Sequence, residues 1–408
     1  MLGGVRVVEF AAAHVMFTGR LLADMGADVI VVEPPGGHRA RTLPPHYPLA
    51  GGGTGSLWWE HHAAGTRSVI ADLGTDEGVS LVRRLLATAD VVLEGEAPGT
   101  LEAIGLGPGD WCVAVPALVW ASLTTFGHWD ARSAEPFSDL TVLAEGGPVW
   151  SCGYDDHSLP PVRGRGDQGY QVGGMFAAMS CLAAVLERAR SGLGQHVDVS
   201  LVAAANVSTE MGSYCWLVAH ETVQRLTGRH AMSYVTTETQ VRAGDGAYVQ
   251  SGIAIRDPSG FAAVIDWLTE IGALDDFPDK VLLGMGAAGT TITADMLGTD
   301  PVATEIARAG REALIFIAGR LPGYDFFLGA QRRGLQCGVV LTPPQVLDDP
   351  HLVSRGWVSS FDHPRLGRPV RVPGPAFRSA IAPWSPRPAP LPGEHHDEVL
   401  AELTRAGV

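Results

Sequence analysis

Four aromatic or imidazole side chains follow a glycine-rich run early in the sequence. The run occupies residues 51–55, and Trp58, Trp59, His61 and His62 come shortly after it. A glycine-rich loop can cradle phosphate groups when it joins a strand to a helix. This run follows no predicted strand and lacks the closing lysine, so a surface loop is the better interpretation. The tryptophans could form an aromatic binding wall, but the alternative, that they anchor a loop in the core, is favoured.

Other side chains that bind metals are scattered along the chain. The five cysteines are odd in number, and no two of them have CxxC spacing. No cluster of histidine, aspartate and glutamate has the spacing of metal ligands, so the sequence predicts neither a metal centre nor a disulfide framework. The cysteines are Cys112, Cys152, Cys181, Cys215 and Cys337.

The charge balance limits the partners. The chain has 29 Lys and Arg against 44 Asp and Glu, a formal net charge of −15, and no basic run of five or more. Nucleic acids bind through neutralisation of their phosphates, so a nucleic-acid partner is not expected. A small anionic molecule remains compatible with the sequence, because a few local cations or helix N-termini suffice to hold it.

The elements that must position these residues begin with a βαβ pattern. Buried β-branched runs joined by amphipathic helices occupy the first 125 residues, which indicates a parallel sheet covered on both faces. The sequence therefore predicts a Rossmann-type α/β sheet. The expected strands are residues 5–10, 28–33, 68–72, 90–93, 113–122 and 196–201, and the expected helices are residues 18–25, 76–88, 171–190 and 203–220.

The pattern of predicted secondary structure changes in the second half of the chain. Short helical runs separated by Gly, Asp and Pro over residues 225–325 predict a second, smaller domain, and a final helix is expected at 396–404. The N-terminus shows no basic segment followed by an apolar one. The longest strongly apolar stretch, 175–186, is shorter than the ~20 residues that span a bilayer. A soluble, cytoplasmic protein is expected.

Several blocks resemble CoA-transferase family III, which includes formyl-CoA transferase, carnitine CoA-transferase and alpha-methylacyl-CoA racemase. They follow the family's order and spacing and extend over nearly the whole chain. The blocks are GVRVVEF (residues 4–10), RLLADMGADVIVVEPPGG (20–37), GGMFAAMSCLAAVLERARSGLGQHVDVSL (173–201), DDPHLVSRGWV (348–358) and PGEHHDEVL (392–400).

This resemblance implies an α/β fold with a Rossmann-like large domain and a small α+β domain. Residues 1–224 and 326–408 are assigned to the large domain and 225–325 to the small one. Two chains are expected to interlock as rings, either as a homodimer or as a heterodimer with a paralogous chain. The implied substrates are coenzyme A or an acyl-CoA and a carboxylic acid acceptor, with no metal and no membrane partner.

The family's nucleophile position is altered in this sequence. In the family, an aspartate attacks the donor thioester to form a mixed anhydride, which released CoA converts to an aspartyl-CoA thioester before the acceptor acid takes the CoA. That aspartate lies four residues before the glycine of a GLYAA-like run; the run here is GMFAA at 174–178, and the position is Tyr170. Tyr170 can act as an acid but, with a reference pKa near ~10, is a poor nucleophile. Asp167, three residues upstream, is the remaining carboxylate candidate, and its alternative role is an acid at the start of a helix.

The segments expected to hold CoA are altered as well. Thr66 replaces a lysine that would meet CoA phosphates, and Glu96 introduces a negative charge that would repel them. Arg41 and Arg67 remain as the candidate cofactor-binding cations, with a solvated surface arginine as the alternative for each. The histidine that racemases of this fold use corresponds to Ser138, which disfavours racemisation relative to transfer.

Three functions remain open from the sequence. The first is CoA transfer between an acyl-CoA donor and a carboxylic acid acceptor, with Asp167 as a displaced nucleophile. The second is a catalytically silent subunit that pairs with an active paralogue. The third is racemase, isomerase or lyase chemistry on a CoA-linked acid, using Tyr170 or a histidine.

Overall fold

A computed structural model describes residues 1–49, 52–234, 236–252 and 255–408. The chain divides into two compact units. The first unit consists of Met1–Cys152, Pro161–His220 and Leu347–Val408, and the second of Gly153–Pro160 and Glu221–Val346.

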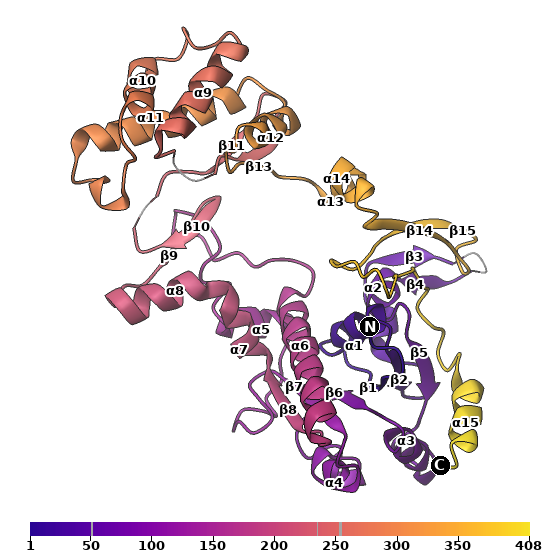
Figure 1. Ribbon diagram of the computed structural model, residues 1–408. Helices are drawn as coiled ribbons and strands as arrows, with labels where there is room; N and C mark the ends of the chain where they lie inside the picture. Colours follow the sequence, from indigo (N-terminus) through magenta and orange to yellow (C-terminus); the bar gives the residue numbers. More distant parts are fainter. Residues whose placement is uncertain (50–51, 235, 253–254) are drawn as a thin grey trace. The chain divides into compact units, whose positions relative to one another are not determined.

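A six-stranded sheet forms the centre of the first unit (Figure 1). Its order is β5-β2-β1-β6-β7-β8, and every neighbouring pair is parallel. The chain leaves β1 for β2 on one side and later returns to β6 on the other, so the strand order reverses between β1 and β6. The predicted α/β sheet is confirmed. The strands are β1 (Arg6–Phe10), β2 (Asp28–Glu33), β5 (Arg67–Ile70), β6 (Val91–Glu94), β7 (Val119–Thr124) and β8 (His196–Ser200).

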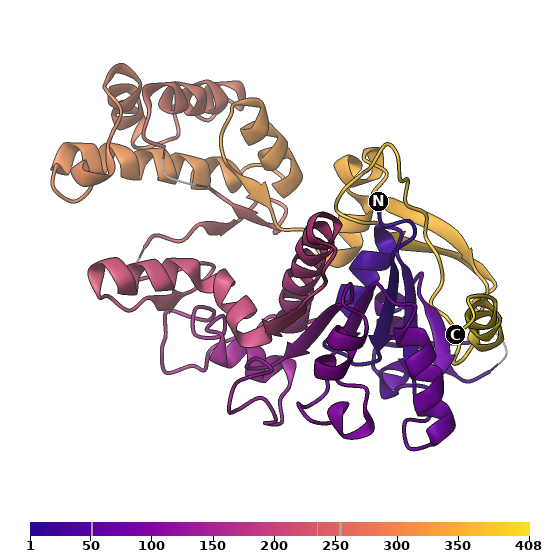
Figure 2. The ribbon, with the colours of Figure 1, turned by 60° about the horizontal axis from the view of Figure 1, so that its bottom comes forward.

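Helices cover both faces of this sheet (Figure 2), as strands that are apolar on both sides require. One face carries α1 (Met16–Asp24) and α6 (Gln168–Ser191), and the other carries α3 (Asp76–Leu86) and α15 (His396–Arg405). Trp120 of β7, fully buried, lies in the core beneath the second face. Both faces of the sheet are therefore buried, and the ends of its strands remain as the place where a ligand can approach.

Two predicted elements are wrong. The expected strand over residues 113–122 begins too early, because a proline in the first turn starts α4 (Pro108–Ala114) and the strand forms only at β7. The expected helix over 203–220 is broken into shorter pieces. These are α7 (Leu201–Asn206), a 3-10 turn (Val207–Thr209), α8 (Glu210–Tyr214) and a π-helical turn (Cys215–Ala219).

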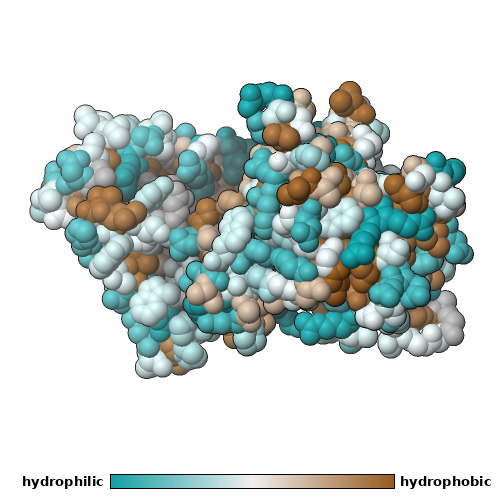
Figure 3. Space-filling view, turned by 90° about the horizontal axis from the view of Figure 1, so that it is seen from below, coloured by the Kyte–Doolittle hydropathy of each residue, from teal (hydrophilic) through white to brown (hydrophobic). Residues whose placement is uncertain are grey.

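The helix predicted over residues 171–190 is confirmed as α6, which begins three residues earlier and ends one residue later. It has 24 residues, and within the described chain it is the helix long and apolar enough to cross a membrane, by length and composition only. Core helices of soluble proteins pass the same test, and α6 packs against α1 and α7. The face seen in Figure 3 carries apolar side chains in small groups between hydrophilic ones.

The second unit is mainly helical, with a three-stranded sheet at one side. Its core contains Phe261, Trp267 and Phe326. The predicted limit of the small domain at residue 325 falls inside α12, so this unit extends further along the chain than expected. Its elements are β9 (Gln224–Leu226), β10 (Arg229–Met232), β11 (Gln240–Arg242), β12 (Tyr248–Gln250), α9 (Pro258–Glu270), α10 (Lys280–Ala288), α11 (Pro301–Ala318), α12 (Gly323–Arg332) and β13 (Gly338–Val339).

The C-terminal segment returns to the first unit. After α13 (Pro343–Asp348) and α14 (Pro350–Ser354), it forms an antiparallel hairpin of β14 (Val358–His363) and β15 (Arg368–Pro373), and then α15. Helix α15 packs beside β5, where Figures 1 and 2 both show it.

The glycine-rich run and its neighbours are structural. Gly51 lies outside the described residues, and Thr54–Ser56 forms β4, which pairs with β3 (His46–Pro48). Helix α2 (Leu57–His62) follows and buries Trp58 and Trp59, which are 8% and 3% exposed. The tryptophans are therefore core anchors, as favoured from the sequence.

Candidate active site

A cavity of about 340 Å³, called here the sheet-edge cavity, opens beyond the carboxyl ends of β1, β6 and β7. In open parallel sheets, ligands bind at this edge where the strand order reverses, which in this chain is between β1 and β6. The residues that line it are Ala13, His14, Arg39, Gly95, Glu96, Ala97, Thr124, Ser133, Ala134, Glu135, Pro136, Phe137 and Tyr170.

His14 lies on the loop that follows β1. Its Nε2–H donates to the carbonyl oxygen of Gly95 at 3.1 Å. A methyl group at residue 95 would lie 2.1 Å from that nitrogen, so glycine is required for this approach. Burial lowers the pKa of His14 to about 4. The imidazole is therefore neutral at pH 7 and contributes hydrogen bonds to the cavity, not charge.

Tyr170 lies in the first turn of α6. Its ring centroid is 5.8 Å from that of His14 and 6.2 Å from that of Phe137, so three rings form one side of the cavity. Burial first, and then the charges of Asp139 and Asp167, raise the pKa of Tyr170 to about 12. The phenol stays protonated at neutral pH, so it can donate a hydrogen bond but is not a nucleophile.

Asp139, at the start of α5 (Asp139–Glu145), fixes the first turn of α6. Its Oδ1 accepts hydrogen bonds from the backbone N–H groups of Gly169 (2.8 Å) and Tyr170 (3.2 Å), and its Oδ2 lies 3.4 Å from Arg163 Nη1. These are two of the N–H groups that a helix start leaves without a partner. Asp167 was the acid that the sequence predicted for the start of this helix, and Asp139, distant in sequence, accepts the hydrogen bonds instead.

We expect Asp139→Ala to lower the free energy of unfolding by about 2–6 kcal/mol, because two backbone N–H groups at the start of α6 lose their acceptor at roughly 1–3 kcal/mol each. Chemical denaturation followed by circular dichroism measures this loss. Asp110→Ala, at an exposed carboxylate on α4, is the control and should change stability by less than about 0.5 kcal/mol. Equal effects of the two substitutions would contradict the capping role.

Asp167 is held away from the sheet-edge cavity. It occupies the N-cap of α6 in the left-handed conformation (φ 57°, ψ 41°) and makes no side-chain bond to the helix. Its Oδ2 accepts instead from the indole Nε1–H of Trp58 at 2.7 Å, and Trp58 stacks on His62 with centroids 3.8 Å apart. The structure therefore places Asp167 against α2, while Tyr170 faces the cavity.

Arg41 and Arg67 both have carboxylate partners. Arg41 forms a bidentate pair with the buried Glu33, at 2.6 and 2.7 Å, and its guanidinium lies over the Trp59 ring. Arg67 bonds to Asp28 at 2.6 Å and to Glu402 at 2.8 Å, and joins β5 to α15. Neither arginine lines the sheet-edge cavity.

The charged residues of the cavity are Arg39, Glu96 and Glu135. Among the described residues Arg39 has no ion pair, and it is exposed, so its guanidinium is available to an anion. Arg41, the cation predicted from the sequence, turns toward Glu33 instead, and nothing in the local run Arg39-Ala40-Arg41 indicates this. Glu96 is anchored through its backbone, whose N–H donates to Glu94 at 2.8 Å.

Comparison with known proteins decides the family. The profile of CoA-transferase family III matches residues 2–280 and 325–396. The chain belongs to CoA-transferase family III. It is 28% identical over 403 residues to succinyl-CoA:(R)-benzylsuccinate CoA-transferase subunit BbsE of Thauera aromatica, covering 97% of this chain and 93% of that protein. It is 30% identical over 418 residues to succinyl-CoA–D-citramalate CoA-transferase of Chloroflexus aurantiacus, covering 98% and 94%.

The fold agrees with solved members of CoA-transferase family III. The structure of a CAIB/BAIF family protein from Brucella suis superposes with a TM-score of 0.78, at 25% identity, over 98% of this chain and 99% of that one. Membership implies CoA esters as substrates. It also makes the phenol of Tyr170 the feature of the site that most needs an explanation.

Proposed function

We propose that this chain takes part in the transfer of CoA from a succinyl-CoA donor to a carboxylic acid, as a subunit that binds the CoA thioester but lacks its own nucleophile. The observation that carries this proposal is Tyr170, which stands at the family's aspartate position and lines the sheet-edge cavity with its pKa raised to about 12. The substrate class comes from the relatives, both of which are named for transfer from succinyl-CoA.

The missing aspartate would be supplied by a paralogous chain in an interlocked heterodimer. One relative is itself named a subunit, which supports a two-chain enzyme. In such a pair, the partner's carboxylate attacks the thioester carbonyl of succinyl-CoA, which forms a mixed anhydride and releases the CoA thiolate. The thiolate then attacks the aspartyl carbonyl of the anhydride, so that aspartyl-CoA forms and succinate leaves. The acceptor carboxylate attacks this second thioester in the same way, and the released thiolate attacks the acceptor carbonyl of the new anhydride, which gives the product thioester and restores the aspartate.

The residues of this chain would bind and orient the thioester. Arg39 is the cation available for a CoA phosphate or a substrate carboxylate. The Tyr170 hydroxyl can donate a hydrogen bond to an oxygen in the cavity. Neutral His14 shapes the wall through its bond to Gly95. Such preorganised donors stabilise charge that develops on a carbonyl oxygen.

Asp167 is the second candidate, as a displaced nucleophile within this chain. Two features would allow its carboxylate to move. Its side chain is held by a single hydrogen bond from the indole of Trp58, and it follows Gly166, whose φ is 96°. A rearrangement of this turn would have to bring the carboxylate to the cavity. Since the capping of α6 by Asp139 leaves Tyr170 in place, the geometry favours the subunit proposal.

Three measurements on the purified chain separate these functions. Calorimetric titration with CoA and with succinyl-CoA should show micromolar binding. Intact-protein mass spectrometry after incubation with succinyl-CoA should show no covalent CoA adduct, and chromatography should show no new thioester with dicarboxylic acid acceptors.

Asp167→Asn is the variant that decides between the candidates. A covalent adduct in the wild type that disappears in Asp167→Asn would assign the nucleophile to Asp167 and refute the subunit proposal. Turnover of a CoA thioester that persists in Asp167→Asn would instead indicate isomerase or lyase chemistry. Absence of CoA binding in the isolated chain would refute CoA-thioester binding by this subunit.

A further inference from the structure

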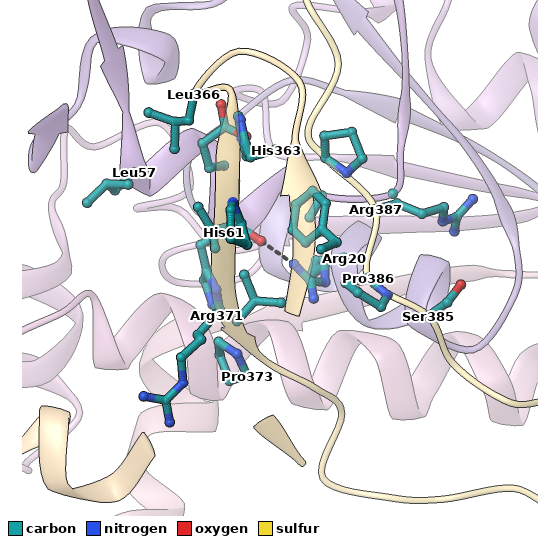
Figure 4. Close-up of a pocket in the computed structure, with 18 of the residues that line it drawn as sticks. Arg20, Leu57, His61, His363, Leu366, Arg371, Pro373, Ser385, Pro386 and Arg387 are labelled. Atoms are coloured by element: carbon teal, nitrogen blue, oxygen red, sulfur yellow. Dashed lines mark hydrogen bonds and ion pairs between the residues drawn. The ribbon is translucent and has the colours of Figure 1, made fainter. Parts of the chain in front are cut away.

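A second cavity, of about 520 Å³, lies within the first unit and shares no lining residue with the sheet-edge cavity. We call it the hairpin cavity, because its walls come from α1, α2, the hairpin β14–β15 and residues 384–388 (Figure 4). Its volume falls within the ~300–1,000 Å³ range of small-molecule sites. No role in CoA transfer follows from its position.

The walls of the hairpin cavity are mostly apolar. The apolar lining residues are Leu57, Ala64, Phe361, Leu366, Pro369, Val370, Val372, Pro373, Trp384, Pro386 and Pro388. Such walls fit an alkyl chain or a ring, and its burial would contribute roughly 25 cal/mol per Å² of apolar area.

One buried cation is fixed at the wall formed by α1. Arg20 is 7% exposed, and its Nε and Nη1 donate to Asp24 (2.9 Å) and to the carbonyl oxygen of His61 (2.6 Å), the bond drawn in Figure 4. Among the described residues Nη2 has no acceptor. A guanidinium held on two sides with its third nitrogen available is preorganised for an anion.

The carboxylates of the cavity already have partners. Asp24 also accepts from the indole Nε1–H of Trp384 at 2.7 Å. Glu60 accepts from the hydroxyl of Tyr47 at 2.5 Å, and bonds to His363 and Arg365. The charge of each carboxylate is therefore matched by a neighbouring cation or donor, and neither is available to a ligand.

Two further arginines lack a carboxylate. Within the described chain, neither Arg368 nor Arg387 forms an ion pair, and Arg387 bonds only to the carbonyl oxygen of Ala23 at 3.5 Å, in the same turn of α1 as Arg20 and Asp24. In a protein with a net charge of −15, this is a local excess of positive charge around an apolar space.

We propose that the hairpin cavity binds a carboxylic acid with an apolar body, its carboxylate held by Arg20 and Arg387 and its body against the hairpin. The apolar walls alone would accept a neutral molecule equally well. The free Nη2 of Arg20 and the guanidinium of Arg387, which has no carboxylate partner among the described residues, select an anion, since a charge-assisted hydrogen bond is stronger than a neutral one. The site is separate from the proposed CoA site.

Isothermal titration calorimetry with octanoate tests the proposal. Octanol, which lacks the carboxylate, and succinate, which lacks the long apolar chain, are the control ligands. Octanoate should bind saturably. Octanol should bind at least ~10-fold more weakly because it cannot form the charge-assisted hydrogen bond, and succinate at least ~10-fold more weakly because it lacks the apolar body. Arg387→Gln should lower the affinity for octanoate at least ~10-fold, and Val370→Trp should abolish octanoate binding because the larger side chain fills the hairpin cavity. Arg405→Gln, at an exposed arginine of α15, should leave it unchanged.

Three outcomes would overturn the proposal. These are no binding of octanoate to the wild type, octanol binding as tightly as octanoate, or unchanged octanoate affinity in both Arg387→Gln and Val370→Trp. Thermal melts verify that the variants fold, and Arg387→Met is the substitute if Arg387→Gln does not fold. Succinyl-CoA titration of Val370→Trp should match the wild type, so a failure here is distinguishable from a failure of the proposed function.

Discussion

Tyr170→Asp is expected to convert the chain from one that binds succinyl-CoA into one that is covalently labelled by it. The substitution places a carboxylate, ionised at neutral pH, at a position that lines the sheet-edge cavity in the first turn of α6. An oriented nucleophile accounts for several orders of magnitude in rate, so labelling should rise at least ~100-fold over the wild type. Intact-protein mass spectrometry after incubation with succinyl-CoA measures it.

Tyr170→Asn is the matched control, since it has the size of aspartate but no nucleophilic oxygen. It should remain unlabelled, while the double variant Tyr170→Asp, Asp167→Asn should be labelled like Tyr170→Asp alone. Labelling that needs Asp167 in the double variant would contradict the assignment of the nucleophile position to residue 170.

Glu9→Gln is expected to stabilise the protein at neutral pH. Glu9 lies on β1, fully buried, and neither carboxylate oxygen has a hydrogen-bond partner among the described residues. The carboxyl group fits beneath α1 only because residue 19 is glycine, where a methyl group would lie 1.7 Å from Glu9 Oε2. Burial first, and then the charge of Glu33, raise the pKa of Glu9 from 4.5 to about 8.

The direction of the pH effect follows from this raised pKa. Above pH 4.5 the unfolded chain loses the proton that the folded chain keeps, so the free energy of unfolding falls as the pH rises, by about 1.4 kcal/mol per unit until about pH 8. Glutamine removes this dependence. The free energy of unfolding of Glu9→Gln should therefore exceed that of the wild type by an amount that grows with pH and reaches about 3 kcal/mol near pH 7.

Denaturant unfolding at pH 5, 6, 7 and 8 measures this difference. Glu77→Gln, at an exposed position of α3, is the control, and its free energy of unfolding should change with pH as that of the wild type does. A constant offset between Glu9→Gln and the wild type across this range would contradict the buried, protonated state of Glu9.

The sheet could be predicted from the sequence because its strands are continuous runs of buried β-branched residues. Residues 28–33 are such a run, and β2 begins and ends where the pattern does. The pattern failed at residues 113–122, where an apolar run follows a helix-starting proline. There local turn chemistry, not hydrophobicity, set the boundary of β7.

The site could be predicted only where it depends on neighbours in sequence. The assignment of the nucleophile position to Tyr170 is a prediction from a local motif, and Tyr170 lines the sheet-edge cavity. The capping of α6 by Asp139 joins positions 30 residues apart, and the hydrogen bond from Trp58 that holds Asp167 joins positions 109 residues apart. Such pairings arise from the tertiary fold, which local spacing does not encode.

The covering of the sheet by α15 has a consequence during synthesis. Val399 and Leu403 are fully buried against the face that also packs Ile30 and Val69, so strands made first are covered by the helix made last. At roughly 5–20 residues per second, the ribosome needs roughly a quarter of a minute to a minute between β5 and α15. Throughout that interval this part of the nascent chain presents an uncovered apolar surface, to which chaperones that bind such surfaces have access.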